Sequence, residues 1–153
     1  MPQSPRAATT PQSVAERLGS SLKAAEQVLI AAKSRALREF DLTVPQYATL
    51  LALHLTPGQS AAQLARAATV SPQTMSTIVG NLEMKGLVRR EVSPLHTRVL
   101  VTTITGEGTE LVVAADAKAR AIEDALAAQF SPGELIAFRD YLQRAIEQLQ
   151  REA

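Results

Sequence analysis

A short helix is predicted over residues 72–82, and its two faces differ in chemistry. The face expected to point outward holds small or hydrogen-bonding residues and no carboxylate: Gln73, Ser76, Thr77 and Gly80. The opposite face is apolar at helical spacing: Met75, Ile78, Val79 and Leu82. Amides and hydroxyls can bond base edges in the major groove of DNA, where phosphates would repel a carboxylate. The pattern therefore favours a helix that reads DNA over the alternative, a solvated polar face.

Serines mark the starts of two helices joined by a tight turn. Ser60, with Gln63 three residues later, has the spacing of a capping box. Ser71 precedes Pro72, and proline suits the first helical position because its missing N–H has no partner there. We therefore predict a helix-turn-helix over residues 60–82.

A two-stranded hairpin is predicted after this unit. Gly86 can take the left-handed conformation that ends a helix. Residues 87–92 and 98–104 have strand character, and Ser93-Pro94-Leu95-His96-Thr97 lies between them as a turn. The order helix, turn, helix, hairpin is typical of a winged helix-turn-helix.

Longer helical patterns lie on both sides of this unit. Apolar residues recur from Val14 to Phe40, from Thr105 to about Gln129, and onward from a capping box at Ser131. The first of these helices would be roughly 40 Å long, more than one small domain needs, so we expect it to pack against another chain.

A further helix is predicted between the first long helix and the helix-turn-helix. Thr43 and Gln46 form a capping box, and Leu42 is placed to pack on Tyr47 as a hydrophobic staple. Because this helix is apolar nearly all round as far as Leu55, we expect it to be buried.

Charge is distributed unevenly along the 153 residues, a length that suits one domain. Residues 57–104 have five basic and two acidic groups, whereas residues 105–153 have five basic and nine acidic groups. The chain has no cysteine, which excludes disulfides and thiolate metal sites and fits a cytoplasmic protein. Residues 1–13 have no apolar segment, so we expect a disordered tail and neither a signal peptide nor a membrane anchor.

Catalytic and metal-binding patterns are not found in the sequence. The two histidines fall on different predicted elements, and neither a Gly-rich phosphate loop nor an H-E-x-x-H motif occurs. We therefore expect no enzyme activity, no cofactor and no metal site.

From about residue 14 to residue 150, the chain resembles the MarR family of bacterial transcriptional regulators. The resemblance is strongest in VSPQTMSTIVGNLEMKGLVRR (Val70–Arg90), in the hairpin, and in VLVTTITGEG (Val99–Gly108). It implies a mostly α fold with a small β-hairpin wing (α+β) and a homodimer whose first, fifth and sixth helices interlock. In such a dimer the fourth helix enters the major groove and the wing enters the minor groove. Many members release DNA when a small, often aromatic or phenolic ligand binds.

The expected division of the chain follows from this resemblance. Residues 14–153 form one domain, with dimerisation helices in 14–42 and 105–150 and a DNA-binding lobe in 43–104.

Two positions depart from the family pattern. The wing of the family usually carries Asp-x-Arg, and here the matching residues are His96-Thr97-Arg98. The recognition helix commonly bears arginine where this chain has Thr77 and Asn81. In some members such an arginine pairs with the wing acid, so its loss together with the acid leaves no unpaired carboxylate. The departure leaves the orientation of the wing open.

Candidate DNA contacts fall into three groups. The helix residues expected to face the groove are Ser71, Gln73, Thr74, Ser76 and Thr77. Positioning contacts to the DNA backbone are expected from Ser60, Arg66 and Arg89. The wing contributes His96, Thr97 and Arg98, with the Arg98 cation in the minor groove. The alternative for Arg98 is a solvated strand residue, and His96 can equally be a turn residue without a role.

The resemblance also implies a ligand crevice between the dimerisation helices and the lobe. Phe40, Tyr47 and His54 are the residues expected to line it. The alternative for Phe40 and Tyr47 is packing in the hydrophobic core. The alternative for His54 is a structural position near a helix C-terminus, where the helix dipole favours a charged imidazole.

The sequence therefore predicts a homodimeric, DNA-binding repressor that acts on a pseudo-palindromic operator and responds to a small molecule. The alternative is a helical dimer that serves as a protein–protein interaction module without binding DNA.

Overall fold

The computed structural model describes residues 13 and 16–152 and consists mainly of helices. The helices are α1 (Leu18–Leu37), the 3-10 turn η2 (Arg38–Phe40), α2 (Val44–Leu55), α3 (Ala61–Ala68), α4 (Pro72–Met84), α5 (Gly106–Ala127) and α6 (Pro132–Glu152). Strands β1 (Val88–Val92) and β2 (Leu100–Ile104) pair antiparallel, with Val88 opposite Ile104. Within the described residues, no helix is long and apolar enough to cross a membrane. The predicted tail, apart from Ser13, lies outside the described residues.

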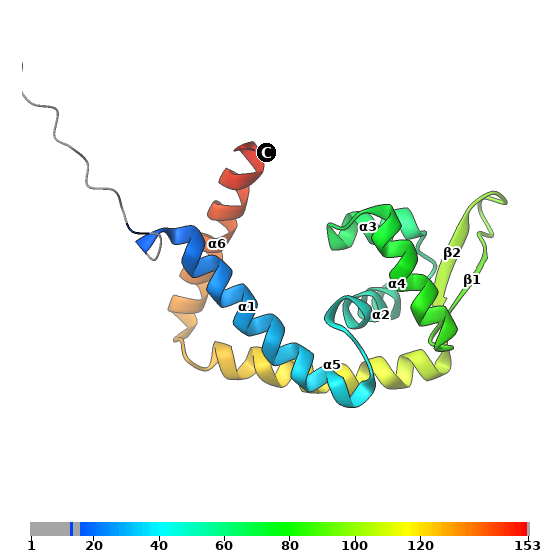
Figure 1. The fold of residues 1–153 in the computed structure, drawn as a ribbon, viewed down its shortest axis with the longest axis horizontal. Coiled ribbons are helices and arrows are strands. Elements are labelled where there is room, and N and C mark those ends of the chain that lie inside the picture. The colour runs from blue at the N-terminus through cyan, green and yellow to red at the C-terminus, as the bar shows by residue number, and fades with distance from the viewer. Residues whose placement is uncertain (1–12, 14–15, 153) are drawn as a thin grey trace, which may run out of the picture.

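The elements form two groups, which we call the frame and the lobe (Figure 1). The frame consists of α1, α5 and α6, and the lobe consists of α2, α3, α4 and the hairpin. Helix α5 runs along one side of the molecule from beneath the hairpin to the turn into α6 (Figure 1). The lobe therefore sits near one end of the frame, and α6 lies at the other end.

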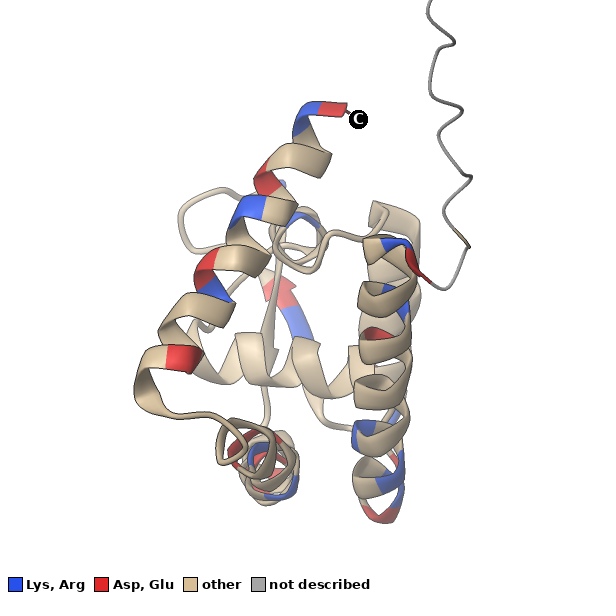
Figure 2. Cartoon of the chain, turned by 90° about the vertical axis from the view of Figure 1, so that its left-hand side faces the viewer, with Lys and Arg blue, Asp and Glu red and all other residues tan. Residues whose placement is uncertain are grey.

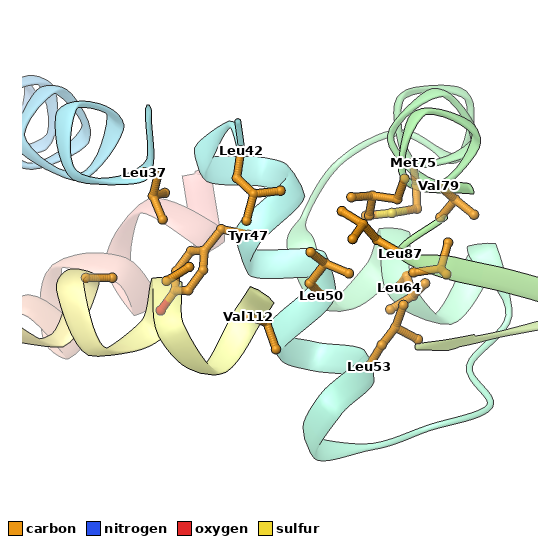
Figure 3. Close-up of a cluster of buried hydrophobic side chains, with 14 of the residues drawn as sticks. Leu37, Leu42, Tyr47, Leu50, Leu53, Leu64, Met75, Val79, Leu87 and Val112 are labelled. Atoms are coloured by element: carbon orange, nitrogen blue, oxygen red, sulfur yellow. The ribbon is translucent and has the colours of Figure 1, made fainter. Parts of the chain in front are cut away.

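Helix α2 is the centre of the hydrophobic core. Leu50 and Leu53 of this helix are fully buried, and Val112 of α5 packs in the same cluster (Figure 3). Met75 and Val79 of α4 are also buried there, so one continuous core joins the frame to the lobe. The apolar face predicted for α4 is confirmed.

Local hydrogen bonds start the helices at the predicted residues. Thr43 Oγ1 accepts the Gln46 N–H at 3.3 Å while Gln46 Oε1 accepts the Thr43 N–H at 3.1 Å. The Ser131 side chain accepts the Glu134 N–H at 3.4 Å, and Glu134 returns a carboxylate to the Ser131 N–H. Each box satisfies donors that a helix start leaves without an intrahelical partner, so the predicted capping boxes are confirmed.

Several predicted boundaries and exposures are wrong. Helix α1 runs only from Leu18 to Leu37, and Val14, the predicted first residue, lies outside the described residues. The η2 turn follows, and it ends at Asp41, which adopts a left-handed conformation with φ 52°. Helix α2 is not buried all round, since its last residue, Leu55, is 73% exposed. Strand β2 begins at Leu100, two residues later than expected.

Helix α6 has no buried residue, although it is amphipathic. Its large apolar side chains are at least 42% exposed at five positions: Ile136, Phe138, Tyr141, Ile146 and Leu149. Acidic and basic residues alternate along the rest of the helix (Figure 2). Tyr141 and Arg144 line a hollow of about 550 Å³ together with Leu18 of α1. The frame thus presents an uncovered apolar surface at the end remote from the lobe.

The frame and the lobe are in tight contact at Gly108, in the first turn of α5. A Cβ atom at this position would lie 2.1 Å from the Leu87 carbonyl oxygen and 2.8 Å from Ile104 Cγ1. The Leu87 oxygen also accepts the Thr105 N–H at 3.0 Å, and the Thr105 hydroxyl donates to the Gly86 carbonyl at 2.8 Å. The start of α5 is therefore bonded to the turn that leads into β1.

We expect Gly108→Ala to destabilise the protein by about 3 kcal/mol or more, because the added methyl group must displace backbone atoms. The matched control is Gly106→Ala, where an added Cβ meets no atom within 4 Å. That change should be neutral or slightly stabilising. Urea unfolding at one protein concentration measures both, and equal midpoints for the two variants would contradict the close contact.

Candidate nucleic-acid interface

Helix α4 is held at its start by a side-chain cap that also uses two of the candidate contact residues. Ser71 Oγ accepts the Thr74 N–H at 3.0 Å and donates to Thr74 Oγ1 at 2.8 Å. Thr77 Oγ1 donates back to the Gln73 carbonyl at 3.2 Å. The hydroxyls of Ser71, Thr74 and Thr77 are therefore partly engaged within the chain. Their remaining lone pairs, and the methyl groups of the two threonines, are available to a ligand.

Gln73 and Ser76 are the candidate contact residues of α4 whose side chains remain free. Both side chains are exposed, and neither has a hydrogen-bond partner among the described residues. A glutamine amide can donate and accept at once, which is the pattern that an adenine edge matches in the major groove. The two side chains are thus the best placed of the α4 candidates for reading bases.

Helix α3 supplies the second part of the interface. Ser60 Oγ accepts the Gln63 N–H at 3.2 Å, and Gln63 Oε1 accepts the Ser60 N–H at 2.8 Å, so the predicted cap is present. Arg66 is exposed in the last turn of α3. Thr69 then turns the chain toward α4 in a left-handed conformation with φ 55°. The hydroxyl of Ser60 is largely used by its cap, whereas the Arg66 guanidinium faces solvent.

The wing projects from the lobe beside α4, and its tip points away from α5 (Figure 1). His96, Thr97 and Arg98 are exposed in the loop between the strands. Arg98 lies in this loop and not in β2, because the Ser93 N–H bonds the Val99 carbonyl at 2.8 Å and closes the hairpin there. The three predicted wing contacts therefore lie together at the tip.

Arg90 ties the wing to α4. Its Nε donates to Glu83 Oε2 at 3.0 Å, and its Nη2 contacts the same oxygen. The hydrogen bond from Arg90 lowers the pKa of the Glu83 carboxyl, and the same bond raises the pKa of Arg90. The sequence did not point to this pair. It bears on the orientation of the wing, because it joins the middle of β1 to α4, whereas the family's ion pair at the tip of the wing is absent here.

A second ion pair joins the end of α4 to the linker between α1 and α2. Lys85 Nζ lies 3.0 Å from Asp41 Oδ2 and also donates to the Asp41 carbonyl. Asp41 and Lys85 are 44 residues apart, so spacing along the sequence could not have revealed the contact.

The Arg89 side chain points to the opposite face of β1 from that of Arg90, because successive side chains of a strand alternate between its faces. It is exposed, and its Nε lies 3.7 Å from Glu91 Oε2. An exposed pair at this distance is weak, so the guanidinium can exchange the carboxylate for a phosphate at little cost.

The three residues predicted for a ligand crevice do not share one environment. Phe40 is half-buried against the core, and Tyr47 is buried within it (Figure 3 shows Tyr47). The Tyr47 hydroxyl donates to Asp116 Oδ1 of α5 at 2.7 Å. Burial, and then the bond to Asp116, raise the pKa of the Tyr47 phenol. His54 is exposed two turns further along α2. The structure therefore brings Phe40 and Tyr47 into one cluster and leaves His54 at the surface.

Known proteins with similar sequences are transcriptional regulators. A family model described as "MarR family" matches residues 40–99. The HTH-type transcriptional repressor Rv2887 of Mycobacterium tuberculosis is 35% identical over 127 residues, which cover 83% of this chain and 91% of the relative. The repressor NicR of Pseudomonas putida is 30% identical over 138 residues, covering 90% of this chain and 87% of the relative.

Solved structures agree with these matches. The MepR–DNA complex of S. aureus superposes with a TM-score of 0.82 at 25% identity, covering 86% of this chain and 98% of MepR. Rv2887 in complex with p-aminosalicylic acid superposes with a TM-score of 0.65 at 34% identity, covering 84% of this chain and 98% of Rv2887. The winged helix-turn-helix fold and the sequence relationship lead to one assignment: this chain belongs to the MarR family of transcriptional regulators.

Proposed function

We propose that this protein is a homodimeric repressor that binds a pseudo-palindromic DNA site. The observation that carries the proposal is the outer face of α4 between Gln73 and Gly80, where Gln73, Ser76 and Thr77 are exposed and no carboxylate occurs. A face of this chemistry fits the major groove. The Rv2887 and NicR relatives are named repressors, and the MepR structure contains DNA, which supports the same role for this chain.

The interface residues divide the work of binding. Gln73 and Ser76 read base edges, with Thr74 and Thr77 contributing methyl contacts and spare lone pairs. Arg66, Arg89 and Arg98 neutralise phosphates. These electrostatic contacts add affinity for any DNA sequence but do not select one. Ser60, Ser71, His96 and Thr97 contribute polar contacts at the edges of the interface.

A second copy of the chain covers the apolar surface of the frame. The exposed stripe of α6 and the hollow it shares with α1 provide the interface. Two-fold symmetry then places the two α4 helices about one turn of DNA apart, roughly 34–36 Å. Dimerisation is therefore part of how the site is recognised.

A small aromatic acid is the class of effector that we propose. Rv2887 has been crystallised with p-aminosalicylic acid and with salicylic acid. Here Phe40 and Tyr47 lie where the frame meets the lobe, and His54 lies further along the same helix as Tyr47. We propose that the ligand binds more tightly when the spacing of the two lobes does not match the two half-sites. DNA affinity then falls by the difference between the ligand's binding free energies for the two arrangements. We place this regulation in the cytoplasm, where a bacterial repressor meets its operator.

Binding to the intergenic DNA upstream of the gene should depend strongly on salt. Three arginines per protomer give about six phosphate contacts in a dimer, and the slope of log K against log salt should be about −5. Fluorescence anisotropy with a labelled duplex measures this slope. Undetectable or salt-insensitive binding would refute the proposal and favour the alternative, a protein–protein interaction module.

Arg98→Ala and Gln73→Ala should have different effects on binding. Loss of the Arg98 charge should weaken binding to all duplexes and reduce the salt slope by about one unit for each phosphate that is no longer neutralised. Loss of the Gln73 amide should cost about 1–3 kcal/mol on the preferred duplex and relax selectivity at one base pair, with the slope unchanged.

The charge-matched control is Arg139→Ala on α6, which lies at the opposite end of the molecule from the wing (Figure 1). It should leave the slope unchanged. An Arg98→Ala slope equal to that of the Arg139→Ala control would show that Arg98 does not contact DNA.

A further inference from the structure

The tip of the wing is apolar, which its place at the surface does not explain. Leu95 is 84% exposed, more than any other large apolar side chain of the described residues. Three further apolar side chains surround the end of the hairpin and are exposed: Val92, Val99 and Leu100. A cluster of exposed apolar side chains marks a surface that contacts something else.

Hydrogen bonds hold the tip in one conformation. Ser93 is buried, and its Oγ accepts the N–H groups of Leu95 at 3.2 Å and His96 at 3.3 Å. The Val99 N–H bonds the His96 carbonyl at 2.9 Å, and Pro94 fixes one backbone angle. Leu95 is therefore presented by a preorganised loop, so little ordering entropy is lost when the tip binds a partner.

The charges around the tip select the kind of partner. Residues 93–100 contain Arg98 and His96 and no acidic residue. The nearest acidic residue along β1, Glu91, lies beside Arg89. A second wing tip is a poor partner because it would bring another Arg98 without a carboxylate to receive it. A polyanion that also offers apolar surface fits the tip, and the minor groove of DNA provides both, with sugars as its walls and phosphates at its edges.

We propose that Leu95 is an apolar wedge that enters the minor groove beside each half-site and selects a flexible pyrimidine–purine step there. The inference rests on the proposed DNA binding and adds a second source of sequence selectivity to it. Leucine side chains inserted from the minor groove unstack base steps, and pyrimidine–purine steps unstack at the lowest cost. The hydrogen-bond pattern of the minor groove is degenerate, so deformability and not base edges provides the selectivity at this position.

The test uses the full chain and a duplex that it selects from a random-sequence pool. The fluorescent base 2-aminopurine is placed in turn at each flanking step, where it brightens when it is unstacked. Wild-type protein should raise the signal at one step on each side, and Leu95→Ala should not. The matched control is Leu55→Ala, which removes the same side chain from a position that is 73% exposed at the end of α2, outside the wing.

Affinity at that step provides the second readout. With a TA step, Leu95→Ala should bind about tenfold more weakly than wild type, which corresponds to about 1.4 kcal/mol, while Leu55→Ala should match wild type. With an AA step, wild type and Leu95→Ala should bind alike. The salt slope and the binding to an unrelated duplex should be the same for all three proteins, because the leucine side chain carries no charge to neutralise a phosphate.

Three results would overturn the inference. The first is a Leu95→Ala protein that gives the same 2-aminopurine signal and the same preference for the TA step as wild type. The second is a Leu95→Ala protein that binds normally but sediments in a lower oligomeric state than wild type, which would assign the tip to a contact between copies. The third is failure of the wild-type chain to select any duplex, and this result alone would also refute the proposed function.

Discussion

The contact between Gly108 and the Leu87 carbonyl fixes how the lobe is attached to the frame. At that point α5 begins directly against the turn between α4 and β1, with no space for a side chain between them. The Thr105 cap adds hydrogen bonds to the Leu87 and Gly86 carbonyls, and the buried side chains of α2 and α5 continue the contact into the core. Because the joint is close-packed, it constrains the orientation of α4 and the wing relative to the start of α5.

The same close-packed joint is consistent with the proposal that α4, a helix without arginine, contacts DNA. The polar face of α4 between Gln73 and Gly80 carries no charge, so the bonds that it can make depend on where its side chains are held. Gln73 and Ser76 are free to bond a ligand, while the neighbouring hydroxyls bond within the helix. Cations come from neighbouring elements, namely Arg66 on α3 and the arginines of the wing. Glu83 and Arg90 hold that wing beside α4, so the proposed DNA contacts are divided among α3, α4 and the wing.

Features that depend on neighbouring residues in the chain are predictable from sequence, and features that join distant segments are not. The caps at Thr43, Ser60 and Ser71 are bonds between residues three apart, so the spacing alone reveals them. Tyr47 and Asp116 are 69 residues apart, and only the packing of α2 on α5 brings them together. The exposure of Leu55 is not predictable because a helix that is apolar nearly all round gives no sign of which side lacks a neighbour.

In the proposed dimer, two lobes held at a fixed distance by the paired frame bind two half-sites as one unit. The most direct measurement inserts about five base pairs between the half-sites of the selected duplex, which rotates one half-site by about half a turn of DNA. Specific binding exceeds non-specific binding by at least about a thousandfold, so loss of one half-site should weaken binding by about thirtyfold or more. Equal affinity for the original and the lengthened duplex would contradict the account, because it would mean that the two lobes bind independently.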